Sequence, residues 1–152
     1  MKFICDEMLK KLAYWLRIAG HDVIVMPDGT SDRAIVEKAL SENRILLSRD
    51  KKISEFKKVK KSSIILESND LNDCVRELNK KLDVNWLLKP FSRCSNCNSL
   101  LIEATEDQIK QAPEKVKAMD TAFYYCPTCE QLFWEGSHVK NMRKQLLQWS
   151  RG

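Results

Sequence analysis

Four cysteines in the second half of the chain are arranged as two pairs. Cys94 and Cys97 form one CxxC pair, and Cys126 and Cys129 form the other after 28 intervening residues. Two thiolates at this spacing can reach one ion at about 2.3 Å, and two such pairs complete a tetrahedral zinc site. A closed four-thiolate site has no position for water, so we expect zinc to be structural. Two redox dithiols are the weaker alternative, because neither pair lies at a strand-to-helix junction.

Three acids lie where apolar runs end or a helical pattern begins. Asp6 follows the run 3–5, Asp50 comes shortly after the run 45–47, and Asp32 opens a helical pattern. In open α/β sheets, ligands bind at the carboxyl ends of the strands. If the first and third strands are neighbours, the three carboxylates converge and can hold a divalent cation, with Mg or Mn suited to oxygen ligands. The alternative, in which each acid only caps a helix, stays open.

Basic residues accompany the acids. Those near Asp6 and Asp50 are Lys10, Lys11, Arg17, Arg49 and Lys51. The chain has 26 Lys and Arg against 21 Asp and Glu, a net charge of +5, which permits a polyanionic partner without requiring one. Acids and bases mixed at strand ends indicate a metal and phosphate site, whereas the basic runs at 49–61 and 138–151, taken alone, are typical of solvated faces.

Apolar runs alternate with amphipathic segments over the first 88 residues. The pattern predicts strands near 3–5, 23–26, 45–47 and 64–66, and helices near 8–19, 31–40 and 71–82. This alternation predicts an α/β fold, with an open parallel sheet covered by helices on both faces. The pattern ends after residue 88, so we expect one domain at 1–88 and a zinc ribbon with a closing amphipathic helix at 89–152.

Length and hydropathy limit the class of protein. A chain of 152 residues suffices for one domain plus a metal-stabilised module. No segment approaches the roughly 18 apolar residues of a membrane span, and the first residues do not resemble a signal peptide. We therefore expect a cytoplasmic protein without a membrane partner, in which Cys5 and Cys74 are buried, reduced thiols.

The combined pattern resembles the Mut-seven carboxy-terminal ribonuclease family, a branch of the PIN-fold nucleases with an appended zinc ribbon. The residues that carry the resemblance occur in order along nearly the whole chain: Asp6, Leu9 to Ala13, Trp15 to Arg17, Gly20, Ser31-Asp32, Ser48-Arg49-Asp50, Arg93 to Asn98, Cys126 to Cys129, and Phe133 to His138.

The resemblance implies a PIN-like fold and a metal-dependent ribonuclease that acts on RNA. The site residues that it implies are Asp6, Asp32 and Asp50 as Mg or Mn ligands, and Lys11, Arg17 and Arg49 as phosphate-binding groups. A fourth acidic ligand is ambiguous between Asp70 and Asp73.

Two other functions compete with the nuclease. A non-catalytic RNA-binding or ribosome-associated adaptor fits the same composition. A phosphoacceptor receiver domain fits less well, because the chain between Asp50 and Glu67 has no room for a full helix and strand. RNA is the expected partner, and a homodimer stays open.

Overall fold

The computed structural model describes residues 1–152 and contains two sheets, of which the first is parallel. Its strands are β1 (Lys2–Cys5), β2 (Asp22–Val25), β3 (Ile45–Ser48) and β4 (Ser63–Ile65), in the order β2-β1-β3-β4. Phe3 of β1 lies opposite Val23 on one side and Ile45 on the other. The predicted parallel sheet is confirmed, and β1 and β3 are neighbours, as the convergence of the acids requires.

Helices follow the strands in turn. They are α1 (Lys10–Ile18), α2 (Asp32–Ser41) and α3 (Leu71–Lys81), with 3-10 helices η1 (Glu7–Leu9), η2 (Lys51–Glu55) and η3 (Lys57–Ser62) between them. Ser31 caps α2 by accepting a hydrogen bond from the backbone N–H of Ala34 at 3.2 Å. The segment between Asp50 and β4 contains only 3-10 helices, so the full helix of a receiver domain is absent there.

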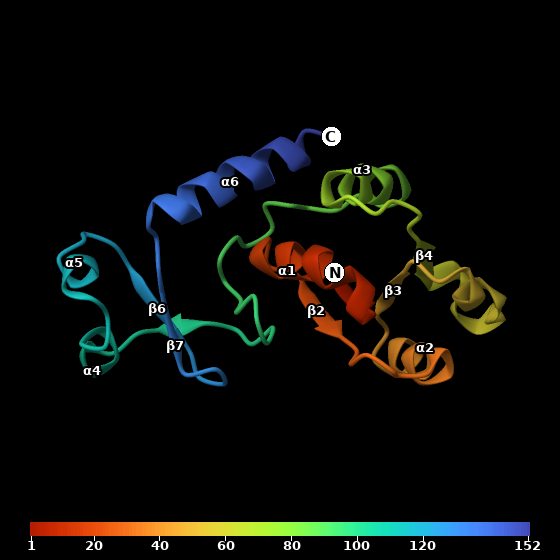
Figure 1. Cartoon of the computed structure of the whole chain (residues 1–152), viewed down its shortest axis with the longest axis horizontal. Helices are drawn as coiled ribbons and strands as arrows, with labels where there is room; N and C mark the ends of the chain where they lie inside the picture. The colour runs from red at the N-terminus through yellow and green to blue at the C-terminus, as the bar shows by residue number, and fades with distance from the viewer.

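The parallel sheet separates two hydrophobic clusters, because successive side chains of a strand point to opposite faces. Phe3 and Cys5 of β1 join the larger cluster with residues of α1 and α3. Ile4 joins the smaller cluster with residues of α2, η2 and η3. Figure 1 shows α1 and α3 on one side of the sheet and α2 on the other. The expected coverage of both faces is confirmed.

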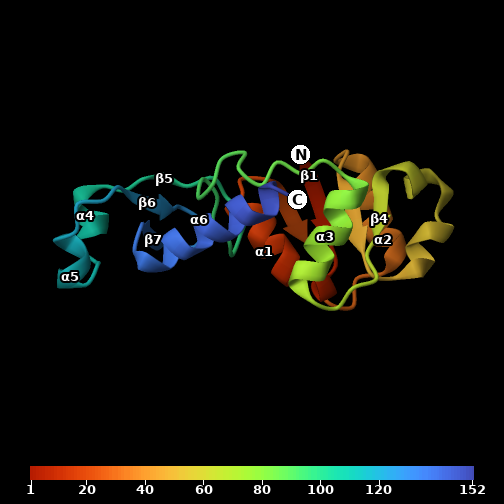
Figure 2. The ribbon, with the colours of Figure 1, turned by 90° about the horizontal axis from the view of Figure 1, so that it is seen from above.

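The second sheet belongs to the ribbon. Its strands β5 (Ile102–Glu103), β6 (Phe123–Cys126) and β7 (Gln131–Trp134) are antiparallel in the order β5-β6-β7. Two short helices, α4 (Glu106–Ile109) and α5 (Glu114–Lys117), occupy the loop between β5 and β6. Thr105 and Gln108 form a capping box at the start of α4. Figure 2 shows the ribbon at one end of an elongated molecule.

The last helix, α6 (Ser137–Ser150), returns from the ribbon to the first sheet (Figure 1). Met142, Leu146 and Trp149 enter the larger cluster, where the Trp149 ring lies 5.0 Å from Trp15 and 5.1 Å from Trp86 between ring centroids. The amphipathic helix and its packing back on the chain are confirmed.

Two details of the helices complete the description. Gly136 is the N-cap residue of α6, and no side chain caps this helix. None of the helices has the length and apolarity that crossing a membrane requires.

Candidate active site and metal centre

The carboxyl ends of β1 and β3 bring Asp6 and Asp50 to one edge of the sheet. Asp6 directly follows β1, and Asp50 is separated from β3 by one residue. Each side chain also caps a 3-10 helix: Asp6 accepts from the N–H of Met8 at 3.0 Å, and Asp50 accepts from that of Lys52 at 2.9 Å. The capping interpretation is confirmed for both acids, and the caps leave further carboxylate lone pairs free. The metal-ligand role of these acids stays a prediction.

Ser48 links the two acids. Its hydroxyl donates to Oδ2 of Asp6 at 3.1 Å and accepts from the backbone N–H of Asp50 at 3.0 Å. Ser48 is buried, so these bonds are shielded from water and fix the direction of the Asp6 carboxylate. Sequence reasoning did not assign Ser48 a role. The available signal was a hydroxyl residue that ends an apolar strand two positions before an acid.

Asp32, the first residue of α2, interacts with the other two acids. Partial burial and the negative charges of Asp50 and then Asp6 raise the pKa of its carboxyl group, while Lys52 opposes them. The oxygen atoms of the three carboxylates do not all lie within 4.8 Å of one another. A cation or proton shared among the acids would relieve the repulsion between their charges. The donor set, consisting only of hard oxygen ligands, matches what Mg or Mn prefers.

The basic residues divide into an exposed and a buried group. Lys11 is exposed on α1 and lines a groove of about 740 Å³ together with Lys10 and Glu7. Arg49 is half-buried, and its Nε atom is buried without a hydrogen-bond partner. Arg17 is buried and bonded to backbone carbonyls, so the structure gives it a structural role. An RNA-binding role for Arg17 stays a prediction.

The two candidates for a fourth acid lie at the start of α3. Asp70 caps this helix by accepting from the N–H of Asp73 at 3.3 Å. Asp73 accepts a hydrogen bond from Arg76 at 2.6 Å. Both side chains are exposed and occupied in stabilising the helix, and the ambiguity between them persists.

The four ribbon cysteines form one cluster, as predicted. Their sulfur atoms all lie within 4.8 Å of one another, and no other group of three or more potential ligand residues is as compact. The Sγ atoms of Cys94 and Cys129 are 3.8 Å apart, and those of Cys97 and Cys126 are 3.4 Å apart. Tetrahedral zinc with bonds of about 2.3 Å needs sulfur atoms about 3.8 Å apart. The cluster therefore fits zinc.

The two CxxC turns share a backbone geometry. The N–H groups of Asn98 and Glu130 donate to the carbonyls of Cys94 and Cys126, each at 2.9 Å. Both residues have positive φ, 75° for Asn98 and 55° for Glu130. This left-handed residue reverses the chain after each pair, which directs both thiols of a pair to the same point.

The thiol of Cys97 shows that this cluster can stabilise a thiolate. Burial alone would raise its pKa, but hydrogen bonds with the side chain and backbone of Ser99, together with the neighbouring thiols, lower the pKa to about 6. A thiolate is the form that binds metal.

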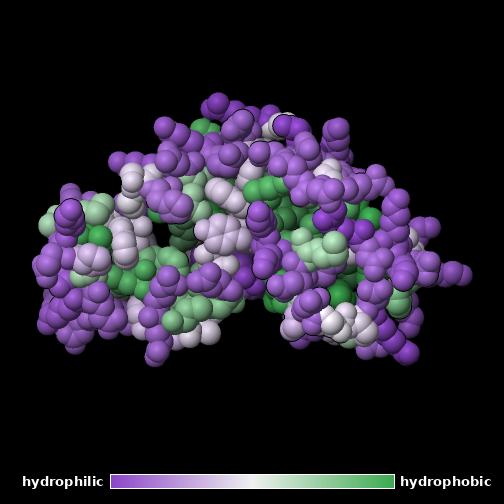
Figure 3. Space-filling view, in the orientation of Figure 1, coloured by the Kyte–Doolittle hydropathy of each residue, from purple (hydrophilic) through white to green (hydrophobic).

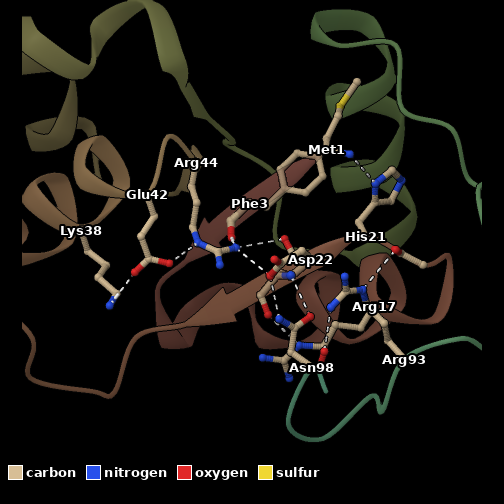
Figure 4. Close-up of polar contacts among 12 residues, drawn as sticks. Met1, Phe3, Arg17, His21, Asp22, Lys38, Glu42, Arg44, Arg93 and Asn98 are labelled. Carbon is tan, nitrogen blue, oxygen red and sulfur yellow. Dashed lines mark hydrogen bonds and ion pairs between the residues drawn. The ribbon is translucent and has the colours of Figure 1, made fainter. Parts of the chain in front are cut away.

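Polar contacts connect the first metal-binding turn to the edge strand β2 (Figure 4). Arg17 donates to the carbonyl of Val23 at 2.8 Å and to those of Ser95 and Asn96 at 3.0 Å each. Asn98 accepts from the N–H of Val23 at 2.9 Å. The turn thus covers an edge that would otherwise present unpaired backbone groups.

Asp22 and Arg44 extend this network toward α2. Asp22 accepts from Asn98 at 2.7 Å and from Arg44 at 2.8 Å, and Arg44 also pairs with Glu42 at 2.9 Å (Figure 4). Burial would raise the pKa of Asp22, but the hydrogen bonds from Arg44 and Asn98 outweigh it and lower the pKa. Asp22 is therefore ionised at neutral pH and holds the turn by charge-assisted bonds.

Comparison with known proteins agrees with this architecture. The family model of the Mut7-C RNAse domain matches residues 1–146, which include the parallel sheet, the acid edge and the cysteine ribbon. No curated protein and no solved structure matches the chain. Because the match spans nearly the whole chain, the protein belongs to the Mut7-C RNAse domain family.

Proposed function

We propose that the protein is a metal-dependent ribonuclease that hydrolyses RNA phosphodiester bonds at the carboxyl edge of the parallel sheet. The observation that carries this proposal is geometric: the neighbouring strands β1 and β3 end beside Asp6 and Asp50, and Ser48 bonds to both residues at this edge of the sheet. Acids that only cap helices have no reason to approach one another, since each cap needs one carboxylate beside one helix start.

Asp6, Asp32 and Asp50 would hold Mg or Mn, with Ser48 orienting Asp6. A divalent ion at this place supplies an activated water and neutralises charge on the phosphate and the leaving oxygen. Lys11 and Arg49 would hold the phosphate backbone beside the acids. Zinc would be the ion of the four-cysteine cluster, with a structural role.

The groove lined by Lys10 and Lys11 supports an RNA path to the acids. It begins beside Glu7, the residue after Asp6, and extends along α1 to Ser95 and Asn96 of the ribbon. Two exposed lysines on its wall provide positive charge for consecutive phosphates. The groove therefore leads from the residue next to Asp6 to the ribbon.

Cleavage of labelled RNA tests this proposal. Zinc-loaded protein is incubated with single-stranded and structured RNAs and with Mn, Mg or neither. We expect metal-dependent cleavage that Asp6→Asn lowers by at least about 100-fold, because it removes a metal ligand. Asp28→Asn is the matched control, since this exposed acid contacts only the neighbouring Gly29 and should cleave as wild type does. Full activity in Asp6→Asn would refute the assignment.

A non-catalytic RNA-binding adaptor is the second candidate function. It is favoured by the capping bonds that Asp6 and Asp50 already make. It predicts no cleavage with either metal, together with RNA binding that is unchanged in Asp6→Asn. The same samples distinguish the two functions when binding and cleavage are measured side by side.

A further inference from the structure

A cavity of about 400 Å³ lies between the ribbon, α1 and α6. Tyr124, Phe133 and Trp134 line it from the ribbon strands, and Tyr14 and Phe91 line it from the side of the first domain. Figure 3 shows an opening on this face, bordered by apolar and near-neutral side chains. Its volume lies in the range of small-ligand sites, about 300 to 1,000 Å³.

The aromatic side chains of this cavity are not a filled core. Tyr124 is 39% exposed, and Phe133 and Trp134 are half-buried, whereas Trp86 in the first domain is fully buried. Aromatic rings that stay accessible in a concave site can stack on a planar ligand, and stacking tolerates any base.

Polar groups at the rim can read the edge of such a ligand. Asn96 donates to the side-chain carbonyl of Gln131 at 3.1 Å, which joins the first metal-binding turn to β7. Whichever way these two amides are oriented, the pair retains a free carbonyl oxygen and free N–H donors. An acceptor beside a donor matches the hydrogen-bonding edge of a nucleobase.

The cavity also continues into the lysine-lined groove. Tyr14, Ser95 and Asn96 line both spaces. Arg143 lies 4.7 Å from the centre of the Phe91 ring and forms an ion pair with Glu135, which also lines the cavity. A strand of RNA with its backbone along Lys10 and Lys11 can therefore place a base in the cavity.

We propose that this cavity binds one unstacked base of single-stranded RNA, by stacking between the ribbon aromatics and Tyr14. The proposal rests on the proposed function, since the bound strand is the one whose phosphates reach the acid edge. It assigns the ribbon a role in substrate selection: RNA with an unpaired base at the right distance from the cleaved bond is bound, and a continuous duplex is not.

A fluorescence experiment tests base binding without cleavage. Zinc-loaded Asp6→Asn protein is titrated, without added Mg or Mn, with single-stranded RNAs that carry 2-aminopurine at successive positions. We expect quenching at one position, because stacking on an aromatic ring quenches this base, and no quenching in a matched duplex. Binding without quenching at any position would overturn the proposal.

Three variants test whether the quenching and the RNA affinity depend on the residues that line the cavity. Trp134→Leu removes a stacking ring while retaining apolar bulk, and should abolish quenching and weaken affinity about tenfold or more. Gln131→Ala, on an exposed residue, should weaken affinity for the base by less without disturbing the fold. Tyr125→Leu is the control, since Tyr125 neighbours Tyr124 on β6 but does not line the cavity. Equal affinity in Trp134→Leu and the control would overturn the proposal.

The measurements distinguish failure of the base site from failure of the nuclease assignment. Position-specific quenching without any cleavage by wild-type protein would support the base site and refute the ribonuclease. Metal-dependent cleavage whose rate and KM are unchanged by Trp134→Leu would support the ribonuclease and refute the base site.

Discussion

We call the parallel sheet with its covering helices the sheet domain. This part of the molecule and the ribbon at 93–136 are stabilised by different means. The sheet domain has two hydrophobic clusters, in which Phe3, Ile4 and Leu47 are fully inaccessible to water. Between residues 93 and 136, the buried residues are Cys94, Ala112 and Cys126, and two of these belong to the four-cysteine cluster. So little buried apolar area offsets only part of the conformational entropy, so we expect the folding of this segment to depend on a bound metal.

The two regions meet where the first CxxC turn contacts the edge strand β2. The ribbon contributes its first metal-binding turn to β2, through Arg17 and Asn98. The sheet domain contributes the edge strand β2, and the turn contributes the polar groups that bond to it. A zinc ion in the four-cysteine cluster would stabilise this turn, and with it the position of the ribbon beside the groove.

Metal removal should produce the largest effect. Cys126→Ser leaves three ligands, and zinc binding contributes on the order of 10 kcal/mol to the folding of small zinc domains. We expect hydrogen exchange to show loss of protection in β6 and β7, while β1 and β3 remain protected. Cys74→Ser, outside the cluster, should keep its zinc. Simultaneous loss of protection in both sheets would show that the two regions fold as one unit.

Shortening a buried side chain of α6 should have the next largest effect on stability. Leu146 of α6 is fully buried in the larger cluster, and Leu146→Ala should lower the free energy of unfolding by about 2 to 5 kcal/mol. Leu147→Ala, at a position that is 41% exposed, should change it by less than about 0.5 kcal/mol. Urea unfolding of zinc-loaded protein measures both. Equal effects would mean that α6 does not complete the core of the sheet domain.

Lowering the pH should decrease the free energy of unfolding of the sheet domain, because of His21. This side chain is buried against Phe3, and its Nε2 lies 2.9 Å from the carbonyl oxygen of Asn85. Burial lowers its pKa, and the amino terminus of Met1 and the charge of Arg93 lower it further, against the hydrogen bond to Asn85. The unfolded chain therefore binds a proton at a higher pH than the folded chain does.

The difference between the pKa values of His21 in the folded and unfolded chain determines how stability changes with pH. Above about pH 6.5 histidine is neutral in both states and stability is complete, and as the pH falls below this value the free energy of unfolding decreases, by about 1.4 kcal/mol for each unit between the two pKa values. His21→Gln should flatten this slope between pH 7.5 and 5.5 in urea unfolding. A variant with the wild-type slope would show that other groups cause the acid sensitivity.

The sequence predicted the fold where one physical signal dominated. Runs such as 45–47 are apolar throughout, so they had to be strands buried on both faces, and the CxxC spacing had to bring four thiols together. The topology of open α/β sheets allows β1 and β3 to be neighbours without requiring it, and the structure shows that they are.

The parts that the sequence did not predict depend on contacts between distant residues. The bridge that Ser48 makes between Asp6 and Asp50 requires the relative positions of two strands. Arg17 lies on one helical stripe with Lys10 and Tyr14, which favours an exposed position, and its burial is explained by the approach of the ribbon turn at Ser95 and Asn96. The cavity beside Trp134 lies where α6 leaves the ribbon and returns to the first sheet. No local sequence pattern encodes how these segments are arranged in space.

The two CxxC turns should show the smallest difference between the two regions. Asn98 and Glu130 occupy equivalent positions in these turns, and replacing each by glycine should change the free energy of unfolding in opposite directions. Asn98→Gly removes the hydrogen bonds to Val23 and Asp22, and should lower stability by about 1 to 3 kcal/mol. Glu130→Gly relieves a positive φ at an exposed residue that the sheet domain does not use, and should raise stability by up to about 1 kcal/mol.

Chelator competition for zinc and urea unfolding of the zinc-loaded protein measure both variants. If Asn98→Gly weakens the protein while Glu130→Gly strengthens it, the first turn is part of the sheet domain's edge and the second serves the metal alone. Stabilisation by both substitutions would contradict this, because it would mean that the bonds of Asn98 to β2 contribute less than the strain of its own backbone.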